Sequence, residues 1–153
     1  THPSDQILFL DRIQDPGNLG TIIRTADAAG METIILSKGS ADAYNPKVVR
    51  STAGSILNVH LFYVDDALKT LEALKRMNYK CVATSLEGAV DYNLDDNYGD
   101  KNCLIIGNEA NGVSMEVLEV SDVKVKIPIY GGAESLNASV AAGIMMYRIK
   151  SSR

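Results

Sequence analysis

Short apolar runs alternate with amphipathic segments along the whole chain. The runs are rich in β-branched residues and show no strict apolar–polar alternation, which is typical of strands buried on both faces of a parallel sheet. They predict six strands: Ile7–Leu10, Thr33–Leu36, Val59–Val64, Lys80–Thr84, Cys103–Ile106 and Val123–Ile127.

Most of the segments between these runs have apolar residues at helical spacing. From Asp65 to Met77, apolar residues recur every three or four positions with Lys and Glu between them, which predicts an amphipathic helix lying on the sheet. Residues 85–101 predict an irregular, solvated loop. The alternation of strands and helices predicts an α/β fold with a mainly parallel sheet and helices on both faces. The other predicted helices are Leu19–Ala29, Pro46–Ala53, Ser114–Val120 and Leu136–Lys150.

Composition indicates one globular domain over residues 1–153, with 46% apolar and 22% charged residues. No apolar run approaches the roughly 18–20 residues of a membrane span, and no export signal opens the chain, so we expect a cytoplasmic protein. Cys81 and Cys103 fall inside predicted strands, which favours buried, reduced thiols. His2 and His60 form no ligand cluster, and we expect no metal.

The net charge of −4 argues against a general affinity for nucleic acid, because phosphate binding depends on Lys and Arg. Any binding of RNA must therefore rest on local basic residues, on oligomerisation or on a missing domain. The chain begins Thr-His-Pro without an initiator Met, as expected for a piece of a longer protein that lacks an N-terminal RNA-binding domain.

Three polar, glycine-containing loops follow predicted strands, where parallel sheets bind their ligands. The first contains the turn Asp15-Pro16-Gly17-Asn18, in which Asn18 is the expected N-cap of the next helix. Arg24 follows six residues later. One interpretation is that Arg24 is an exposed arginine whose aliphatic part packs along the helix. An equally good one is that Arg24 and Asn18 together bind a phosphate or carboxylate.

The second loop, LIIGNEANGVS, places Gly107 and then Glu109 directly after a strand. One interpretation makes Glu109 a capping acid for the helix that begins near Ser114. The other orients Glu109 toward a ligand or makes it an anchor for the neighbouring loops, because folding does not require a carboxylate there.

The third loop, IPIYGGAESLNAS, precedes the last predicted helix. Gly131 and Gly132 permit a close approach of the backbone to another group. Ser135 and Asn137 exceed what a single N-cap needs, so at least one of them is expected to face a pocket.

These loops contain no Ser-His-Asp set, no Cys-His pair and no phosphate-binding P-loop. Asn, Arg, Glu and Ser side chains bind and position reagents, but are poorly suited to covalent catalysis. They suit a reaction whose reagents carry their own reactivity, such as methyl transfer from a sulfonium cofactor.

The order and wording of the loops resemble the three motifs of the SpoU (TrmH) family of RNA ribose 2′-O-methyltransferases, in the SPOUT superfamily. Residues 47–55, KVVRSTAGS, resemble the basic segment of that family more weakly. Ala110 departs from the pattern, because the family often has Gly there. The motif matches are Asn18, Gly20, Arg24, Thr25 and Gly30; then Gly107, Asn108, Glu109, Gly112, Val113 and Ser114; then Ile127, Pro128, Ser135, Leu136, Asn137, Ser139 and Ala141.

The resemblance implies an α/β fold with a C-terminal trefoil knot, which binds S-adenosyl-L-methionine largely through main-chain groups. It also implies a homodimer with the last helix in its interface, and Arg24 serving its own or the partner's site. The implied cofactor contacts are Thr84, Leu86, Gly107, Asn108, Ile127 and Leu136. The implied catalytic residues are Arg24, Asn18, Glu109, Ser135 and Asn137, and the implied RNA contacts are Arg24, Lys47 and Arg50.

We therefore expect the catalytic domain of an enzyme that methylates a ribose 2′-hydroxyl in structured RNA, with ribosomal RNA favoured over transfer RNA. An alternative is a non-catalytic knotted module that binds RNA or a protein. A doubly wound nucleotide-binding protein is disfavoured, because the sequence lacks the G-x-G-x-x-G fingerprint.

Overall fold

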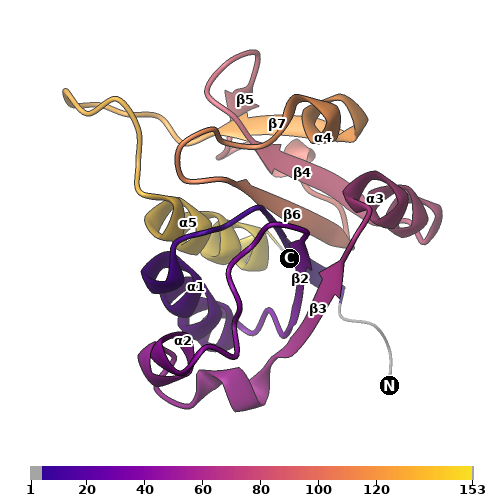
Figure 1. The fold of residues 1–153 in the computed structure, drawn as a ribbon. Helices are drawn as coiled ribbons and strands as arrows, with labels where there is room; N and C mark the ends of the chain where they lie inside the picture. Colours follow the sequence, from indigo (N-terminus) through magenta and orange to yellow (C-terminus); the bar gives the residue numbers. More distant parts are fainter. Residues whose placement is uncertain (1–4, 153) are drawn as a thin grey trace.

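The computed structural model describes residues 5–152 and contains a seven-stranded sheet in the order β3-β2-β1-β6-β4-β7-β5 (Figure 1). Its six strand pairings are all parallel. The strands are β1 (Gln6–Asp11), β2 (Thr33–Ser37), β3 (His60–Val64), β4 (Lys80–Thr84), β5 (Val90–Asp91), β6 (Asn102–Gly107) and β7 (Val123–Lys126). The helices are α1 (Pro16–Ala29), α2 (Pro46–Ser51), α3 (Ala67–Arg76), α4 (Met115–Val120) and α5 (Ala138–Ser151), with 3₁₀ turns η1 (Ser55–Asn58) and η2 (Asp95–Asn97).

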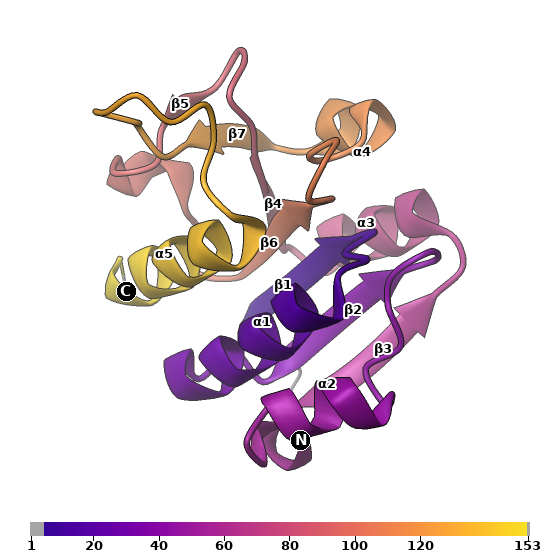
Figure 2. The ribbon, with the colours of Figure 1, turned by 60° about the vertical axis from the view of Figure 1, so that its left-hand side comes forward.

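Alternate residues of the central strands point into two separate cores. On β1, Leu8 and Leu10 join the core beneath α1 and α5, whereas Ile7 and Phe9 join the core beneath α3 and α4. Figure 2 shows α1, α2 and α5 along one face and α3 on the other. The predicted fold class, α/β with helices on both faces of a parallel sheet, is confirmed. The trefoil knot stays a prediction.

The two cysteines are register partners on neighbouring strands, Cys81 on β4 and Cys103 on β6. Both are free and buried, as predicted. A hydrogen bond with Cys81, together with burial, raises the pKa of Cys103 well above the usual thiol value. No helix among residues 5–152 is long and apolar enough to cross a membrane. Within the same residues no cluster of His, Cys, Asp and Glu is placed to hold a metal ion, and His2 lies outside them.

The prediction of an irregular loop over residues 85–101 is wrong in part, because it contains β5 and η2. The short β5 forms by pairing with β7. Arg148 of α5 holds the segment that follows: its Nε donates to Asn93 Oδ1 at 2.9 Å and its Nη2 to Asp95 Oδ1 at 2.6 Å. The guanidinium also lies 5.2 Å from the ring centroid of Tyr98. Partners more than fifty positions away leave no local pattern in the sequence.

Four helix starts also differ from the prediction, those of α3 and α4 by only two residues and one, because these helices begin at Ala67 and Met115. Helix α1 begins at Pro16 and its N-cap is Asp15, not Asn18: the Asp15 carboxylate accepts the Asn18 N–H at 2.8 Å. Proline suits the first helical position, because its missing N–H would have no helical partner there. Helix α5 begins at Ala138, so Leu136 lies before the helix and not within it.

Arg148→Met tests how far this one side chain holds residues 92–98 in place. The side chain is 12% exposed and makes two charge-assisted hydrogen bonds, so the variant should lower the free energy of unfolding by about 1–2 kcal/mol. Hydrogen exchange should accelerate at residues 92–98 and stay unchanged in β1 and β2. The exposed Lys150→Met is the matched control; equal behaviour of the two variants would contradict the anchoring role.

Candidate active site

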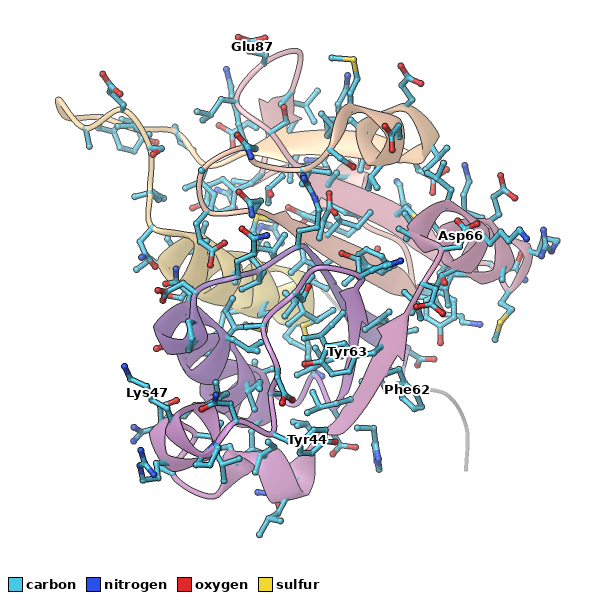
Figure 3. The ribbon with its side chains drawn as sticks, viewed as in Figure 1. Tyr44, Lys47, Phe62, Tyr63, Asp66 and Glu87 are labelled. Carbon is cyan, nitrogen blue, oxygen red and sulfur yellow. The ribbon has the colours of Figure 1, made fainter. Side chains whose placement is uncertain are left out.

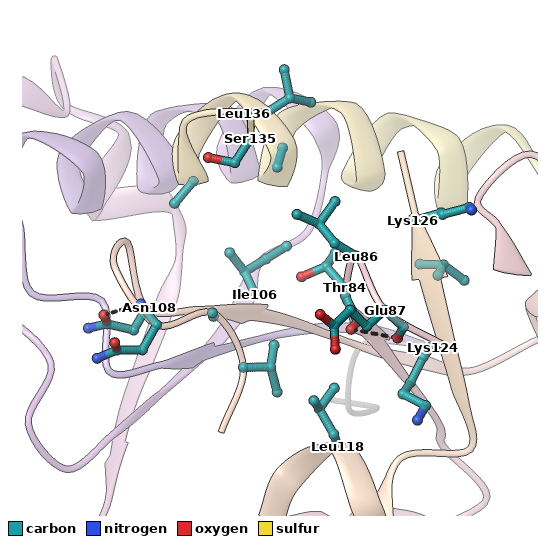
Figure 4. A pocket seen from close by; sticks show the side chains of 18 of the residues that line it. Thr84, Leu86, Glu87, Ile106, Asn108, Leu118, Lys124, Lys126, Ser135 and Leu136 are labelled. Carbon is teal, nitrogen blue, oxygen red and sulfur yellow. Dashed lines mark hydrogen bonds between the residues drawn. The ribbon is translucent and has the colours of Figure 1, made fainter. Parts of the chain in front are cut away.

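A cavity of about 770 Å³ opens at the carboxyl ends of β4, β6 and β7, beside the start of α5 (Figure 4). Ser135 and Leu136 lie on the α5 side of it, across from Leu86 and Ile106. The six residues named as cofactor contacts all line this one cavity, although they come from three strand ends and the segment before α5: Thr84, Leu86, Gly107, Asn108, Ile127 and Leu136.

Gly107 is required by a tight loop on the cavity wall. Residues 108–112 fold back on themselves: the Asn108 N–H donates to the Gly112 carbonyl at 3.0 Å, and the Gly112 N–H donates back at 2.8 Å. A Cβ on Gly107 would lie 2.0 Å from the Val113 nitrogen, so no side chain fits there. The Asn108 side chain braces this loop by donating from Nδ2 to the Arg12 carbonyl at 2.7 Å.

The Glu109 carboxylate ties this loop to the loop that follows β1. Its oxygens accept the Gln14 N–H at 3.1 Å and the Asp15 N–H at 2.6 Å, and the Asn18 side-chain amide lies at 3.5 Å. The anchoring interpretation is therefore confirmed, and that of a cap for α4 is wrong. At the start of α4, it is the Asp11 carboxylate that accepts a backbone hydrogen bond, from the Ser114 N–H at 2.7 Å.

Burial and hydrogen bonding act in opposite directions on Glu109. Partial burial acts to raise the pKa of its carboxyl, but the N–H groups of Gln14 and Asp15 and the Asn18 amide stabilise the charged form and bring the pKa below its ordinary value. The side chain is therefore a carboxylate at neutral pH, and acts as an acceptor only.

Asn137 serves two purposes at once. Its Oδ1 caps α5 by accepting the Ser139 N–H at 2.8 Å, while its Nδ2 donates to Asn18 Oδ1 at 3.1 Å. Glu109, Asn18 and Asn137 thus form a continuous chain of polar contacts that joins the three loops. The sequence indicated that a single N-cap could not account for both Ser135 and Asn137. The structure shows that Asn137 itself does more than cap the helix, because it also contacts Asn18.

Ser135 lines the cavity, but the glycines before it do not act as expected. A Cβ at Gly131 or Gly132 would meet no described atom within 4 Å, and neither residue has a positive φ. Figure 1 shows the segment before α5 projecting from the body of the molecule, and Tyr130 within it is 94% exposed. The close approach predicted for the two glycines is not found within the described part of the chain.

Arg24 takes no part in the hydrogen bonds that link Glu109, Asn18 and Asn137. Its side chain is exposed on α1, does not line the cavity, and makes no hydrogen bond or ion pair with any of residues 5–152. Lys47 and Arg50 are exposed on α2, where Figure 3 shows Lys47 pointing into solvent. The convergence of Arg24 with Asn18 on a phosphate or carboxylate stays a prediction.

Sequence reasoning missed the charged residues of the cavity wall. Glu87 follows β4, Glu119 belongs to α4, and Lys124 and Lys126 belong to β7. For Glu87, Lys124 and Lys126, the available signal was their position within or shortly after predicted strands that end at the same edge of the sheet. Glu119 gave no such signal, because it lies in α4. The four residues give the apolar cavity charges of both signs at its rim.

A family model described as the SpoU rRNA Methylase family matches residues 5–147. The chain belongs to this family. The 23S rRNA (guanosine(2553)-2′-O)-methyltransferase RlmP of Bacillus subtilis is 42% identical over 146 residues, which are 95% of this chain and 58% of RlmP. The chain thus spans a little over half the length of this relative.

Solved structures agree with the family assignment. An AdoMet-bound rRNA methyltransferase from Sinorhizobium meliloti has a TM-score of 0.90 and 37% identity, over 99% of this chain and 58% of that one. The SpoU methyltransferase AviRb from Streptomyces viridochromogenes, in complex with the cofactor AdoMet, has a TM-score of 0.85 and 34% identity, over 97% and 60%. The SpoU chain described here shares their fold over nearly its whole length.

The depressed pKa of Glu109 predicts a pH-dependent contribution to stability. A carboxyl with a lowered folded-state pKa stabilises the fold fully above its ordinary pKa near 4.5, and this contribution is lost as the pH falls through the folded value. Glu109→Ala should therefore be less stable than wild type at pH 7, and the difference should shrink toward acid pH. Urea melts between neutral and acid pH measure it. The exposed Glu72→Ala is the control, and a pH-independent gap for Glu109→Ala would contradict the prediction.

Proposed function

We propose that this chain is the catalytic domain of an RNA ribose 2′-O-methyltransferase, which transfers the methyl group of S-adenosyl-L-methionine to a 2′-hydroxyl of structured RNA. The observation that carries the proposal is the adjacency of two features. A small-molecule cavity opens at one edge of the sheet, and Glu109 in its wall begins the series of contacts that runs through Asn18 to Asn137. The family of the chain and the names of its relatives support the assignment and favour ribosomal over transfer RNA.

The cavity fits the cofactor by size and by chemistry. Its volume of about 770 Å³ lies within the roughly 300–1,000 Å³ of small-molecule sites. The main chain at Gly107, Ile127 and Leu136 offers amides and carbonyls to polar groups, while Leu86 and Ile106 supply apolar walls. The bound cofactor would supply an electrophilic methyl group on its sulfonium.

The residues beside the cavity would position the acceptor ribose. Asn18 is fixed from both sides by Glu109 and Asn137, which holds its amide in one orientation. Glu109 is engaged by backbone N–H groups, so its role is to hold the loops and not to accept the hydroxyl proton. Ser135 shapes the wall between donor and acceptor.

Arg24 does not line the cavity of its own copy, and it would act in the cavity of a second copy of the chain. A guanidinium stays protonated in proteins, so its contribution is to stabilise the developing alkoxide and grip the adjacent phosphate. An exposed apolar stripe on α5 supports a homodimer: Val140 is 51% exposed, Ile144 36% and Tyr147 54%. These residues, three and four positions apart, share one face of the helix.

Lys47 and Arg50 would contact the phosphates of the RNA, because both are exposed and lie three positions apart on α2. Because the net charge is −4, affinity for RNA within the chain itself depends on such local basic groups. We place the protein in the cytoplasm, where an RNA-modifying enzyme meets its substrate.

Binding of S-adenosyl-L-methionine distinguishes the enzyme from a non-catalytic knotted module. Titration calorimetry should show one site per chain for wild type. Ala141→Phe should abolish the binding heat, because Ala141 lines the cavity and a phenyl ring would fill it. A circular-dichroism melt would establish that the variant is folded. Absence of any binding heat with folded wild type would favour the non-catalytic module.

Subunit mixing tests whether Arg24 acts across a dimer. Arg24→Ala and Asn137→Ala should each lower methyl incorporation by about 100-fold or more when assayed alone. Co-expression of the two variants should restore about a quarter of wild-type activity, because half the dimers are mixed and each holds one intact site. If the arginine acts within its own subunit, no chain in the mixture is complete and activity stays at background.

A further inference from the structure

Arg12 occupies a backbone conformation that arginine rarely adopts. Its φ is +59°, in the left-handed region where glycine and asparagine are preferred. The residue directly follows β1: its N–H donates to Ser37 Oγ at 2.9 Å, and its carbonyl accepts from Asn108 Nδ2 at 2.7 Å. Any residue could make these two backbone contacts, so they do not explain why the side chain is that of arginine.

The Arg12 side chain lines a second cavity, of about 400 Å³, which is separate from the proposed cofactor cavity. It lies beyond the carboxyl ends of β1, β2 and β3 and is closed by the starts of α3 and α4. The lining residues include Ser37, Lys38, Asp65, Asp66 and Glu116. This is the edge of the sheet where parallel folds bind ligands.

The guanidinium is only partly engaged. Its Nε lies 3.3 Å from the carboxylate of the buried Asp11, and the two terminal nitrogens have no hydrogen bond or ion pair with any of residues 5–152. The side chain remains 36% exposed. Lys38 lines the same cavity and is exposed, and its side chain makes no hydrogen bond or ion pair within residues 5–152. Two cationic groups are thus available to an anion.

The negative groups in the cavity restrict what that anion can be. Asp66 is occupied as the N-cap of α3, where it accepts the Lys69 N–H at 3.1 Å. Asp65 and Glu116 make no hydrogen bond or ion pair within residues 5–152 and face the cavity as free carboxylates. They would repel a free polyphosphate, but they can accept hydrogen bonds from hydroxyl or amino groups. A nucleotide whose single phosphate belongs to a longer strand satisfies both conditions.

We propose that this second cavity holds one nucleotide of the RNA substrate, with Arg12 and Lys38 binding its phosphate. The proposal rests on the proposed RNA methyltransferase function and adds a contact to it. The hydrogen bond from Asn108 to the Arg12 carbonyl joins the walls of the two cavities. RNA bound at Arg12 would therefore contact a residue that is hydrogen-bonded directly to Asn108 in the wall of the cofactor cavity. The strained backbone is retained because an asparagine or glycine, though easier to accommodate, has no guanidinium.

Arg12→Asn separates binding from stability. Fluorescence anisotropy with an in vitro 23S ribosomal RNA transcript should show several-fold weaker affinity at low salt. The slope of log Kd against log salt should fall by about one phosphate contact. Arg12→Lys should keep the slope. Affinity for S-adenosyl-L-methionine should stay at the wild-type value, and millimolar inorganic phosphate should not displace the RNA.

Ala53→Gly is the matched control, because Ala53 has a φ of +51° and lies outside both cavities. It should relieve comparable strain, raise Tm, and leave the RNA salt slope unchanged. An unchanged slope for Arg12→Asn, above all with a lowered Tm, would overturn the proposal and show that Arg12 serves to neutralise buried Asp11. Displacement of RNA by inorganic phosphate would overturn it too. Lack of methyl incorporation by wild type, with RNA binding and its Arg12 dependence intact, would instead refute the proposed methyltransferase function.

Discussion

The site depends on the Glu109 carboxylate. It follows β6, yet it accepts the backbone N–H groups of Gln14 and Asp15, more than ninety positions earlier in the chain. Those two groups lie in the loop between β1 and α1 and would otherwise need water. Because charge-assisted hydrogen bonds are the stronger kind, one side chain fixes both loops relative to each other. The orientation of Asn18, and through it of Asn137, follows from this arrangement.

The parallel sheet explains why such distant residues meet. All strands end at the same edge, so loops that are separated in sequence become neighbours once the register is set. β1 lies between β2 and β6, and β4 lies between β6 and β7. The first arrangement brings Arg12 beside Ser37 and Asn108. The second brings Thr84, Gly107 and Ile127 to one cavity.

Much of the fold was accessible from local patterns. The six predicted strands are all present, and no predicted end is off by more than one residue. Burial on both faces, as predicted, holds for the central strands β1 and β6, but β3 at the edge of the sheet has no buried residue. The missed strand, β5, consists of two exposed residues, so no buried apolar run marks it in the sequence. It pairs with β7, and Arg148 holds the segment that follows it through the hydrogen bond to Asp95. The N-cap of α1 was misplaced by three positions, since Asp15 and Asn18 are both good capping residues and the chain around Pro16 decides between them.

The sequence by itself determined which residues are chemically unusual: the polar and glycine residues that follow buried strands, among them Glu109 and Asn137. It could do so because burial and capping impose local requirements that these residues exceed. Only the tertiary structure decided what each one touches. In the structure the Glu109 carboxylate accepts backbone N–H groups, Arg24 is not part of the cavity lining, and Arg12 lines a second cavity in a strained backbone conformation. Those outcomes depend on strand order and register, which are set by the packing of the whole sheet and not by any one segment.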